Sequence, residues 1–126
     1  HLEGLTGGDP RIAFRDRVAH EELAAIVRAH HVVVSPSRWE SWSNVVRESL
    51  SWNRPVLSTP VGGVLAAIVP GRTGWLTAGT GVADLQAGIE DLLEAVVHGV
   101  LHLTGMDHET DEGEMLALQA EIRSWL

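Results

Sequence analysis

Three histidines in the last third of the chain have the spacing of a metal site. His98 and His102 are four residues apart, so a helix places both imidazoles on one face. His108 follows six residues later, after Gly105, which allows the chain to turn back. Imidazoles suit zinc, and three protein ligands leave one tetrahedral position open. The spacing therefore predicts one zinc ion per chain, bound by His98, His102 and His108.

The residues between these histidines limit the chemistry of such a site. Zinc peptidases with the same histidine spacing carry a glutamate directly after the first histidine as general base. This chain has Gly99 there, which disfavours peptidase activity. Zinc also brings the pKa of a bound water near neutrality, which suits phosphodiester hydrolysis. Asp107, beside His108, is the candidate catalytic residue, either orienting the site or accepting a proton.

The segment from His98 to His108 reads His-Gly-Val-Leu-His-Leu-Thr-Gly-Met-Asp-His. It resembles the HGxLHLxGxDH signature of the YbeY family of zinc-dependent endoribonucleases, and the resemblance covers residues 94–126. It implies a zinc-dependent hydrolase that cuts RNA. These residues contain seven acidic side chains against one basic side chain, Arg123. Because basic residues supply most of the affinity for RNA, we expect RNA binding to be weak at best.

A second group of polar residues follows the strand expected at residues 31–35. Glu40 and Glu48 lie on either side of the start of an expected helix, and two glycines mark the turn after the next strand. In a parallel sheet, ligands bind beyond the carboxyl ends of the strands, where helix N-termini attract anions. The candidates for binding a nucleotide sugar are Glu40, Ser43, Asn44, Glu48, Gly62 and Gly63.

Three motifs carry a second resemblance. They are the E-x7-E pair from Glu40 to Glu48, the segment Arg54-Pro55-Val56 with the glycines after it, and residues 71–76. With them, residues 11–93 resemble the C-terminal nucleotide-sugar domain of GT-B-fold retaining glycosyltransferases. The resemblance implies that Glu48 binds ribose hydroxyls and Glu40 contacts the donor sugar, so the partner is a nucleoside diphosphate or nucleotide sugar. The family's basic pair and acceptor domain have no counterpart here, so glycosyl transfer by this chain alone is not expected.

The apolar patterning predicts an α/β fold. Helices are expected between the strands, which implies a short parallel sheet of three to four strands with flanking helices, a Rossmann-like half domain. The β-branched run before Ser35 is consistent with a strand buried on both faces. The expected strands are 11–14, 31–35, 55–58 and 74–77, and the expected helices between them are 19–30, 44–52 and 64–69.

A long helix is expected from Val82 onward, followed by a C-terminal helix that starts near Asp111. In the long helix, apolar residues three or four apart form a stripe that should face the core, with His98 and His102 on the opposite side. That stripe is Leu85, Ile89, Leu92, Val96, Val100 and Leu103. The corresponding stripe of the last helix is Met115, Leu118, Ile122 and Trp125.

Length and composition place further bounds on the chain. It has 126 residues, 44% of them hydrophobic, a net charge of −8 and no cysteine. These values predict a globular cytoplasmic protein without disulfides or thiolate ligands, and no apolar run is long enough to span a membrane. We expect a glycosyltransferase-like part at 1–93 and a zinc-motif helical segment at 94–126, packed as one folded unit. Open sheet edges also favour a homodimer.

Three hypotheses for the function remain open from the sequence. The first is a chimeric or shuffled protein with a three-histidine zinc site of the endoribonuclease type. If such a protein were active, it would be a zinc-dependent endoribonuclease-like hydrolase, but we do not expect catalytic turnover. An alternative is a nucleotide-sugar-binding fragment of a glycosyltransferase. A third is a recombined or designed structural fold in which both motifs are vestigial.

Overall fold

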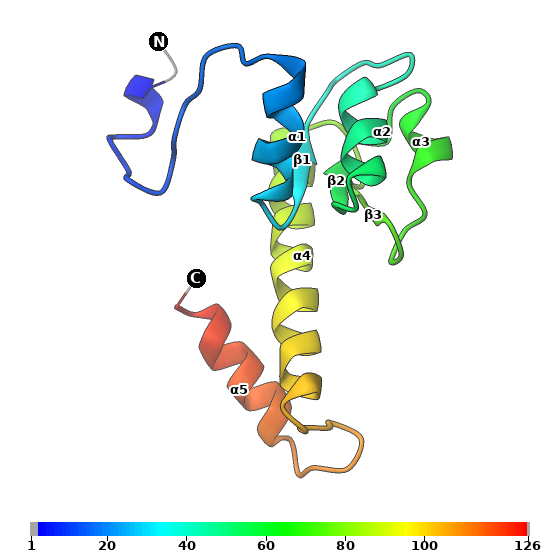
Figure 1. Cartoon of the computed structure of the whole chain (residues 1–126). Helices are drawn as coiled ribbons and strands as arrows, with labels where there is room; N and C mark the ends of the chain where they lie inside the picture. The colour runs from blue at the N-terminus through cyan, green and yellow to red at the C-terminus, as the bar shows by residue number, and fades with distance from the viewer. Residues whose placement is uncertain (1–2, 126) are drawn as a thin grey trace.

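A three-stranded parallel sheet lies at the centre of the N-terminal part of the computed structural model, which describes residues 3–125 (Figure 1). Its strands are β1 (Val33–Ser35), β2 (Val56–Ser58) and β3 (Gly74–Leu76), in the order β1-β2-β3. The α/β class and the short parallel sheet are therefore confirmed. The strand expected at residues 11–14 is wrong, because these residues adopt no regular structure after the short 3-10 helix η1 (Glu3–Leu5).

Helices cover both faces of this sheet. α2 (Asn44–Ser51) and α3 (Val64–Ala67) lie on one face, where Val56 packs in a cluster with Val46 and Val64. α4 (Val82–Leu103) lies on the other face, where Gly88 lets the helix approach Leu57 closely. Since neighbouring residues of a strand point to opposite faces, these two contacts place β2 between two layers of helix.

The middle strand is the one buried on both faces. All residues of β2 are fully buried, whereas Val34 of β1 remains 40% exposed. The sequence assigned double burial to the strand at residues 31–35, and this assignment is wrong, because β1 is an edge strand of the sheet and Val34 stays open to solvent. Helix α1 (His20–Arg28) has no buried residue. The Arg54 side chain, from the loop before β2, donates a hydrogen bond to the Arg28 carbonyl at 2.7 Å and so connects α1 to the sheet.

The second half of α4 extends beyond the sheet and is partnered by α5 (Glu114–Arg123), which packs back along it (Figure 1). The contact is a small core of Val97, Leu101 and Met115. The long helix runs unbroken through residues 93 and 94, as its periodicity predicts.

The apolar stripe expected to bury α4 is wrong in this second half. Val96, Val100 and Leu103 are 53%, 52% and 88% exposed, while Val97 and Leu101 are buried. Helix α5 docks about 100° further round the helix than the expected stripe, because residues 97 and 101 follow 96 and 100 by one position. An apolar face of α4 is therefore left open to solvent.

The last helix begins where the sequence suggests but with different capping. Asp111 accepts hydrogen bonds from the backbone N–H groups of Gly113 and Met115, at 2.8 and 3.0 Å, while Gly113 itself takes the N-cap position in a left-handed conformation. Met115, Leu118 and Ile122 face α4 as expected. Trp125 does not, since it is 69% exposed.

Membrane insertion was not expected from the sequence. Within residues 3–125, none of the helices is both long enough and apolar enough to cross a bilayer.

Candidate functional site

The three histidines predicted to bind zinc come together at the far end of α4. Their ligand nitrogens lie within 4.8 Å of one another, and Nε2 of His98 is 3.1 Å from Nε2 of His102. The ring of His108 is centred 5.1 and 5.3 Å from the other two rings. His102 and His108 are exposed and His98 is half-buried, so the cluster opens to solvent on one side.

The turn after α4 brings His108 back to the helix. Gly105 adopts a φ of +92°, which L-residues with a side chain rarely adopt, and the Met106 N–H donates to the Leu101 carbonyl at 3.1 Å. The glycine predicted to reverse the chain therefore does so, and the reversal sets the third imidazole beside the other two.

Asp107 contacts the backbone of its own turn. Its carboxylate accepts a hydrogen bond from the backbone N–H of Glu109 at 3.0 Å, which stabilises the turn. Over residues 3–125, no hydrogen bond joins this carboxylate to an imidazole. This contact helps to shape the loop that carries His108.

The donor set fits a tetrahedral zinc ion. With Zn–N bonds of about 2.05 Å, two ligand nitrogens of a tetrahedral site lie about 3.3 Å apart, close to the 3.1 Å between His98 and His102. Three imidazoles with one open side leave a fourth position for water or a substrate oxygen. The residue types and the separation between His98 and His102 therefore suit the metal that the spacing predicts.

One residue at this site was missed by the sequence analysis. Gln119 of α5 is 8% exposed and places its Oε1 atom 2.9 Å from Nδ1 of His98. The signal was present, because Gln119 follows Met115 by four residues and precedes Ile122 by three, so it lies on the buried face of α5. A polar residue at such a position indicates a specific partner.

The candidate nucleotide-sugar residues gather at the carboxyl edge of the sheet. Ser43 is the N-cap of α2 and accepts a long hydrogen bond, 3.5 Å, from the Val46 N–H. Asn44 starts the helix and Glu48 lies one turn further on, half-buried. The carboxylate of Glu40 is held by the Ser37 hydroxyl at 2.9 Å.

The glycine turn after β2 packs directly on the Glu40 loop. The Gly63 N–H donates to the Ser41 carbonyl at 2.9 Å, and Gly62 lies so close that a Cβ atom on it would overlap the backbone carbonyl of Glu40. Gly62 and Gly63 are thus required for close approach of the two loops, and they bring Glu40 next to the end of β2.

Replacing Gly62 by alanine is expected to lower the free energy of unfolding by about 2–4 kcal/mol, from a left-handed backbone plus a steric clash. Gly71 is the matched control, since its φ is +73° but nothing lies near its Cβ position. Gly71→Ala should cost only about 1 kcal/mol. Urea unfolding of both variants measures the difference, and equal losses would contradict the packing of the two loops.

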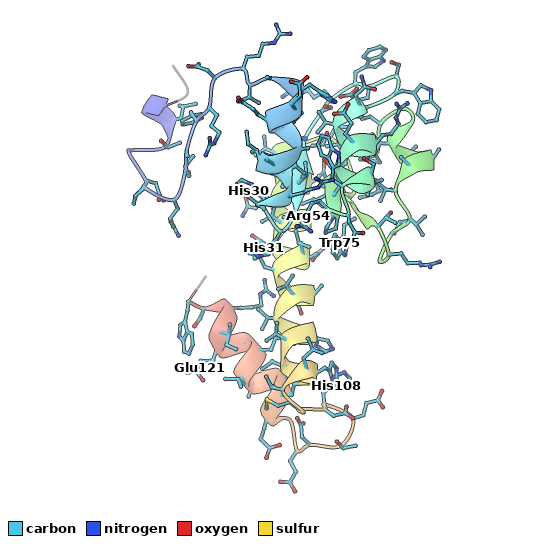
Figure 2. All side chains as sticks on the ribbon, in the orientation of Figure 1. His30, His31, Arg54, Trp75, His108 and Glu121 are labelled. Atoms are coloured by element: carbon cyan, nitrogen blue, oxygen red, sulfur yellow. The ribbon has the colours of Figure 1, made fainter. Side chains whose placement is uncertain are left out.

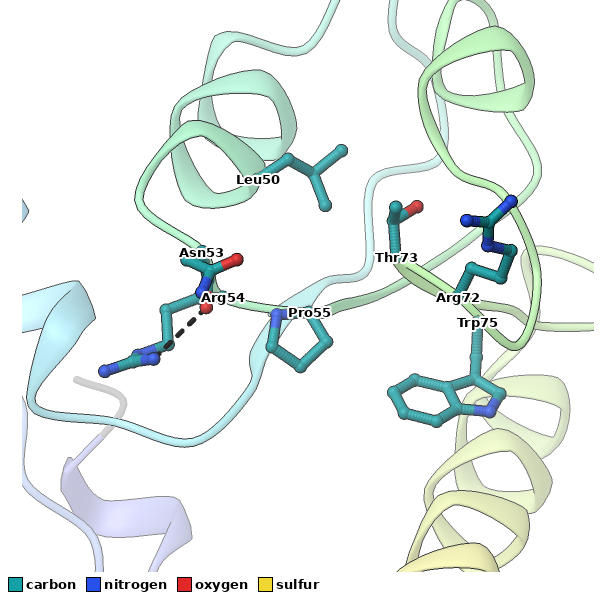
Figure 3. A pocket seen from close by; sticks show the side chains of 7 residues that line it. All are labelled: Leu50, Asn53, Arg54, Pro55, Arg72, Thr73 and Trp75. Carbon is teal, nitrogen blue, oxygen red and sulfur yellow. Dashed lines mark hydrogen bonds between the residues drawn. The ribbon is translucent and has the colours of Figure 1, made fainter.

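Two cavities lie at opposite edges of the sheet. The smaller, about 160 Å³, is at the carboxyl edge and contains one basic side chain, that of Arg38. The larger, about 280 Å³, is at the amino edge between α2 and β3 (Figure 3). There the Arg54 guanidinium points away from the cavity toward backbone carbonyls of Asn53 and Arg28. The smaller cavity lies at the same edge of the sheet as the candidate residues, but none of the six lines it; its lining residues are Pro36, Arg38, Thr59, Thr80, Gly81, Val82 and Leu85.

Comparison with known proteins supports both resemblances. Residues 1–95 match the family model described as glycosyl transferases group 1. The D-inositol 3-phosphate glycosyltransferase of Paenarthrobacter aurescens (strain TC1) is 35% identical over 114 residues, which is 90% of this chain and 26% of that protein. Sucrose-phosphate synthase from Thermosynechococcus elongatus has the same fold over 73% of this chain and 23% of its own, with a TM-score of 0.65 and 29% identity.

The endoribonuclease YbeY of Koribacter versatilis (strain Ellin345) is 42% identical over 66 residues, which is 48% of this chain and 43% of that protein. The match is longer than residues 94–126, about a quarter of the chain, on which the motif resemblance rests. The composite character of the chain is thereby confirmed. The chain spans about a quarter of the length of the glycosyltransferase relative and less than half of the endoribonuclease. By the match over residues 1–95, the chain belongs to the family of group 1 glycosyl transferases.

Proposed function

We propose that this chain provides part of a binding site for the nucleoside diphosphate of a nucleotide sugar. The observation that supports this function best is the close packing of the Gly62-Gly63 turn on the Glu40 loop. It gathers a helix N-terminus, backbone N–H groups and the Glu40 carboxylate at the carboxyl edge of a parallel sheet. That edge is where open α/β sheets bind ligands.

Different groups at this edge bind different parts of the ligand. The N-terminus of α2, with Ser43 and Asn44, attracts negative charge through its free N–H groups and dipole. Arg38 adds a positive charge at the neighbouring cavity. Glu48 is a hydrogen-bond acceptor for ribose hydroxyls, and Glu40 is the acceptor for the sugar.

The size of the cavity indicates an incomplete site. Its volume of about 160 Å³ is below the roughly 300 Å³ at which typical small-molecule sites begin. We therefore expect weak binding, with dissociation constants near the millimolar range, and no transfer of the sugar by these residues alone.

Titration with UDP and GDP, followed by amide NMR signals, tests this function. Signals of residues 38–48 and 62–63 should shift, and Glu48→Gln should weaken binding about tenfold, because a hydrogen bond to a charged group contributes about 1.5 kcal/mol. Glu121→Gln, on exposed α5, is the matched control and should leave the affinity unchanged. Spectra that do not change on addition of either nucleotide would refute the proposal.

A second function, zinc binding, is favoured by the convergence of His98, His102 and His108. In the same proposal, residues 94–126 are a metal-binding segment packed on a glycosyltransferase-like part at 1–93. A zinc ion held there would act as a Lewis acid toward a phosphodiester or another oxygen ligand. The protein's own residues hold the ion and keep its open side toward solvent. The metal content of the purified protein tests this second function.

The acidic character of residues 94–126 makes RNA a poor ligand for this segment. Arg123 is its only basic side chain, and that side chain is paired with Glu94 at 2.7 Å. Since phosphate contacts by Lys and Arg supply most nucleic-acid affinity, zinc would be the main positive charge available to RNA.

A further inference from the structure

A hydrogen-bonded series of four polar side chains connects the histidine cluster to α5. Arg123 donates to Oε2 of Glu94 at 2.7 Å, and Oε1 of Glu94 accepts from Nε2 of Gln119 at 3.2 Å. Oε1 of Gln119 then lies 2.9 Å from Nδ1 of His98. The series crosses between the two helices three times, from α5 to α4, back to α5 and again to α4.

This series of hydrogen bonds fixes the orientation of the Gln119 amide. The carboxylate of Glu94 can only accept hydrogen bonds, and its other oxygen is paired with Arg123. The NH2 group of Gln119 must therefore face Glu94, which leaves the carbonyl oxygen to face His98. Turning the amide over would set two acceptor oxygens against each other at Glu94.

The amide orientation in turn determines the tautomer of His98. A carbonyl oxygen accepts only, so Nδ1 of His98 must carry the proton. In a neutral imidazole the lone pair then resides on Nε2. That atom points into the cluster, 3.1 Å from Nε2 of His102.

We infer that Gln119 is a positioning residue for metal binding, which holds His98 in the tautomer whose Nε2 lone pair is available to the ion. The inference rests on the proposed zinc site and deepens it. Because Gln119 belongs to α5 and is 8% exposed, the partner of Nδ1 of His98 is in place only when α5 is docked on α4. Metal affinity and α5 docking are therefore linked through one side chain.

Gln119→Met tests the inference, because methionine has a similar length and shape but no acceptor for Nδ1. In metal-free protein at about pH 8, above the ordinary pKa of a histidine side chain, long-range ¹H–¹⁵N spectra should show His98 protonated on Nδ1 in the wild type and as a tautomer mixture in the variant. Zinc affinity, measured by competition with a chromophoric chelator, should fall about tenfold to a hundredfold.

Two further variants separate positioning from folding. Leu118→Ala weakens the packing of the same helix but leaves the acceptor in place, so the His98 tautomer should not change. Glu94→Gln combined with Gln119→Glu exchanges the two groups, presents a carboxylate to Nδ1 and should restore the tautomer and the affinity.

The results distinguish this inference from the zinc site itself. A wild-type His98 protonated on Nε2, or a Gln119→Met variant with an unchanged tautomer, would overturn the role of Gln119 whatever the metal does. A wild type that has the Nδ1 tautomer but binds no zinc would instead overturn the proposed metal site.

Discussion

Replacing His102 by alanine is expected to abolish zinc binding without unfolding the protein. His102 is exposed, so its loss removes one of three ligands and little packing. Loss of a direct ligand should lower the affinity by more than the roughly hundredfold that supporting residues contribute. The purified wild type should contain about one zinc per chain and the variant essentially none, as measured by elemental analysis.

Thermal melts provide the second readout of this substitution. Zinc at about one hundred times its dissociation constant stabilises the folded wild type by about 2.7 kcal/mol, or roughly 10 °C for a chain of this size. The variant should show no shift on adding zinc or chelator.

His31→Ala is the matched control for His102→Ala. His31 is an exposed histidine near the sheet, far from His108 (Figure 2), and its loss should leave both zinc content and the zinc-dependent shift intact. Equal zinc content in the wild type and the His102→Ala variant would show that the cluster is not the metal site.

Replacing Leu101 by alanine is expected to destabilise the protein by about 2–4 kcal/mol. Leu101 is 4% exposed and packs with Val97 and Met115, the buried residues of the apolar core between α4 and α5. A loss of this size is a large part of the 5–15 kcal/mol typical of a folded domain. Urea unfolding should report it, and hydrogen exchange of the α5 amides should accelerate most.

Leu103→Ala is the same substitution on the same helix and is its control. Leu103 is 88% exposed, so its truncation should change the free energy of unfolding by no more than about 0.5 kcal/mol. A larger loss for Leu103→Ala than for Leu101→Ala would mean that the stripe expected from the sequence, and not the Val97-Leu101 face, packs in the folded protein.

The wrong face of α4 has a clear physical origin. The helix has two apolar pairs spaced four residues apart, Val96 with Val100 and Val97 with Leu101. Helical periodicity is compatible with burial of either pair. The choice is made by α5, whose Met115 packs on Val97 and Leu101. Contacts between distant segments are not encoded in the spacing of one helix.

The prediction of a strand at residues 11–14 was wrong for a related reason. Four residues of suitable type were enough to suggest a strand, but a strand needs a neighbour for its backbone hydrogen bonds. β1 pairs only with β2 among residues 3–125, and the segment before α1 has no partner in the sheet. Pairing is a tertiary property, so composition alone could not decide it.

By itself, the sequence determined the cluster of three histidines, the parallel α/β sheet, the Glu40 loop with the glycine turn that packs on it, and the composite character of the chain. These features depend on local spacing, namely four residues between histidines on a helix, a glycine where φ must be positive, and alternation of strand and helix. Only the tertiary structure decided which face of α4 is buried and that Gln119 contacts His98. Those two features depend on where α5 docks, which is set by packing between residues more than ten positions apart.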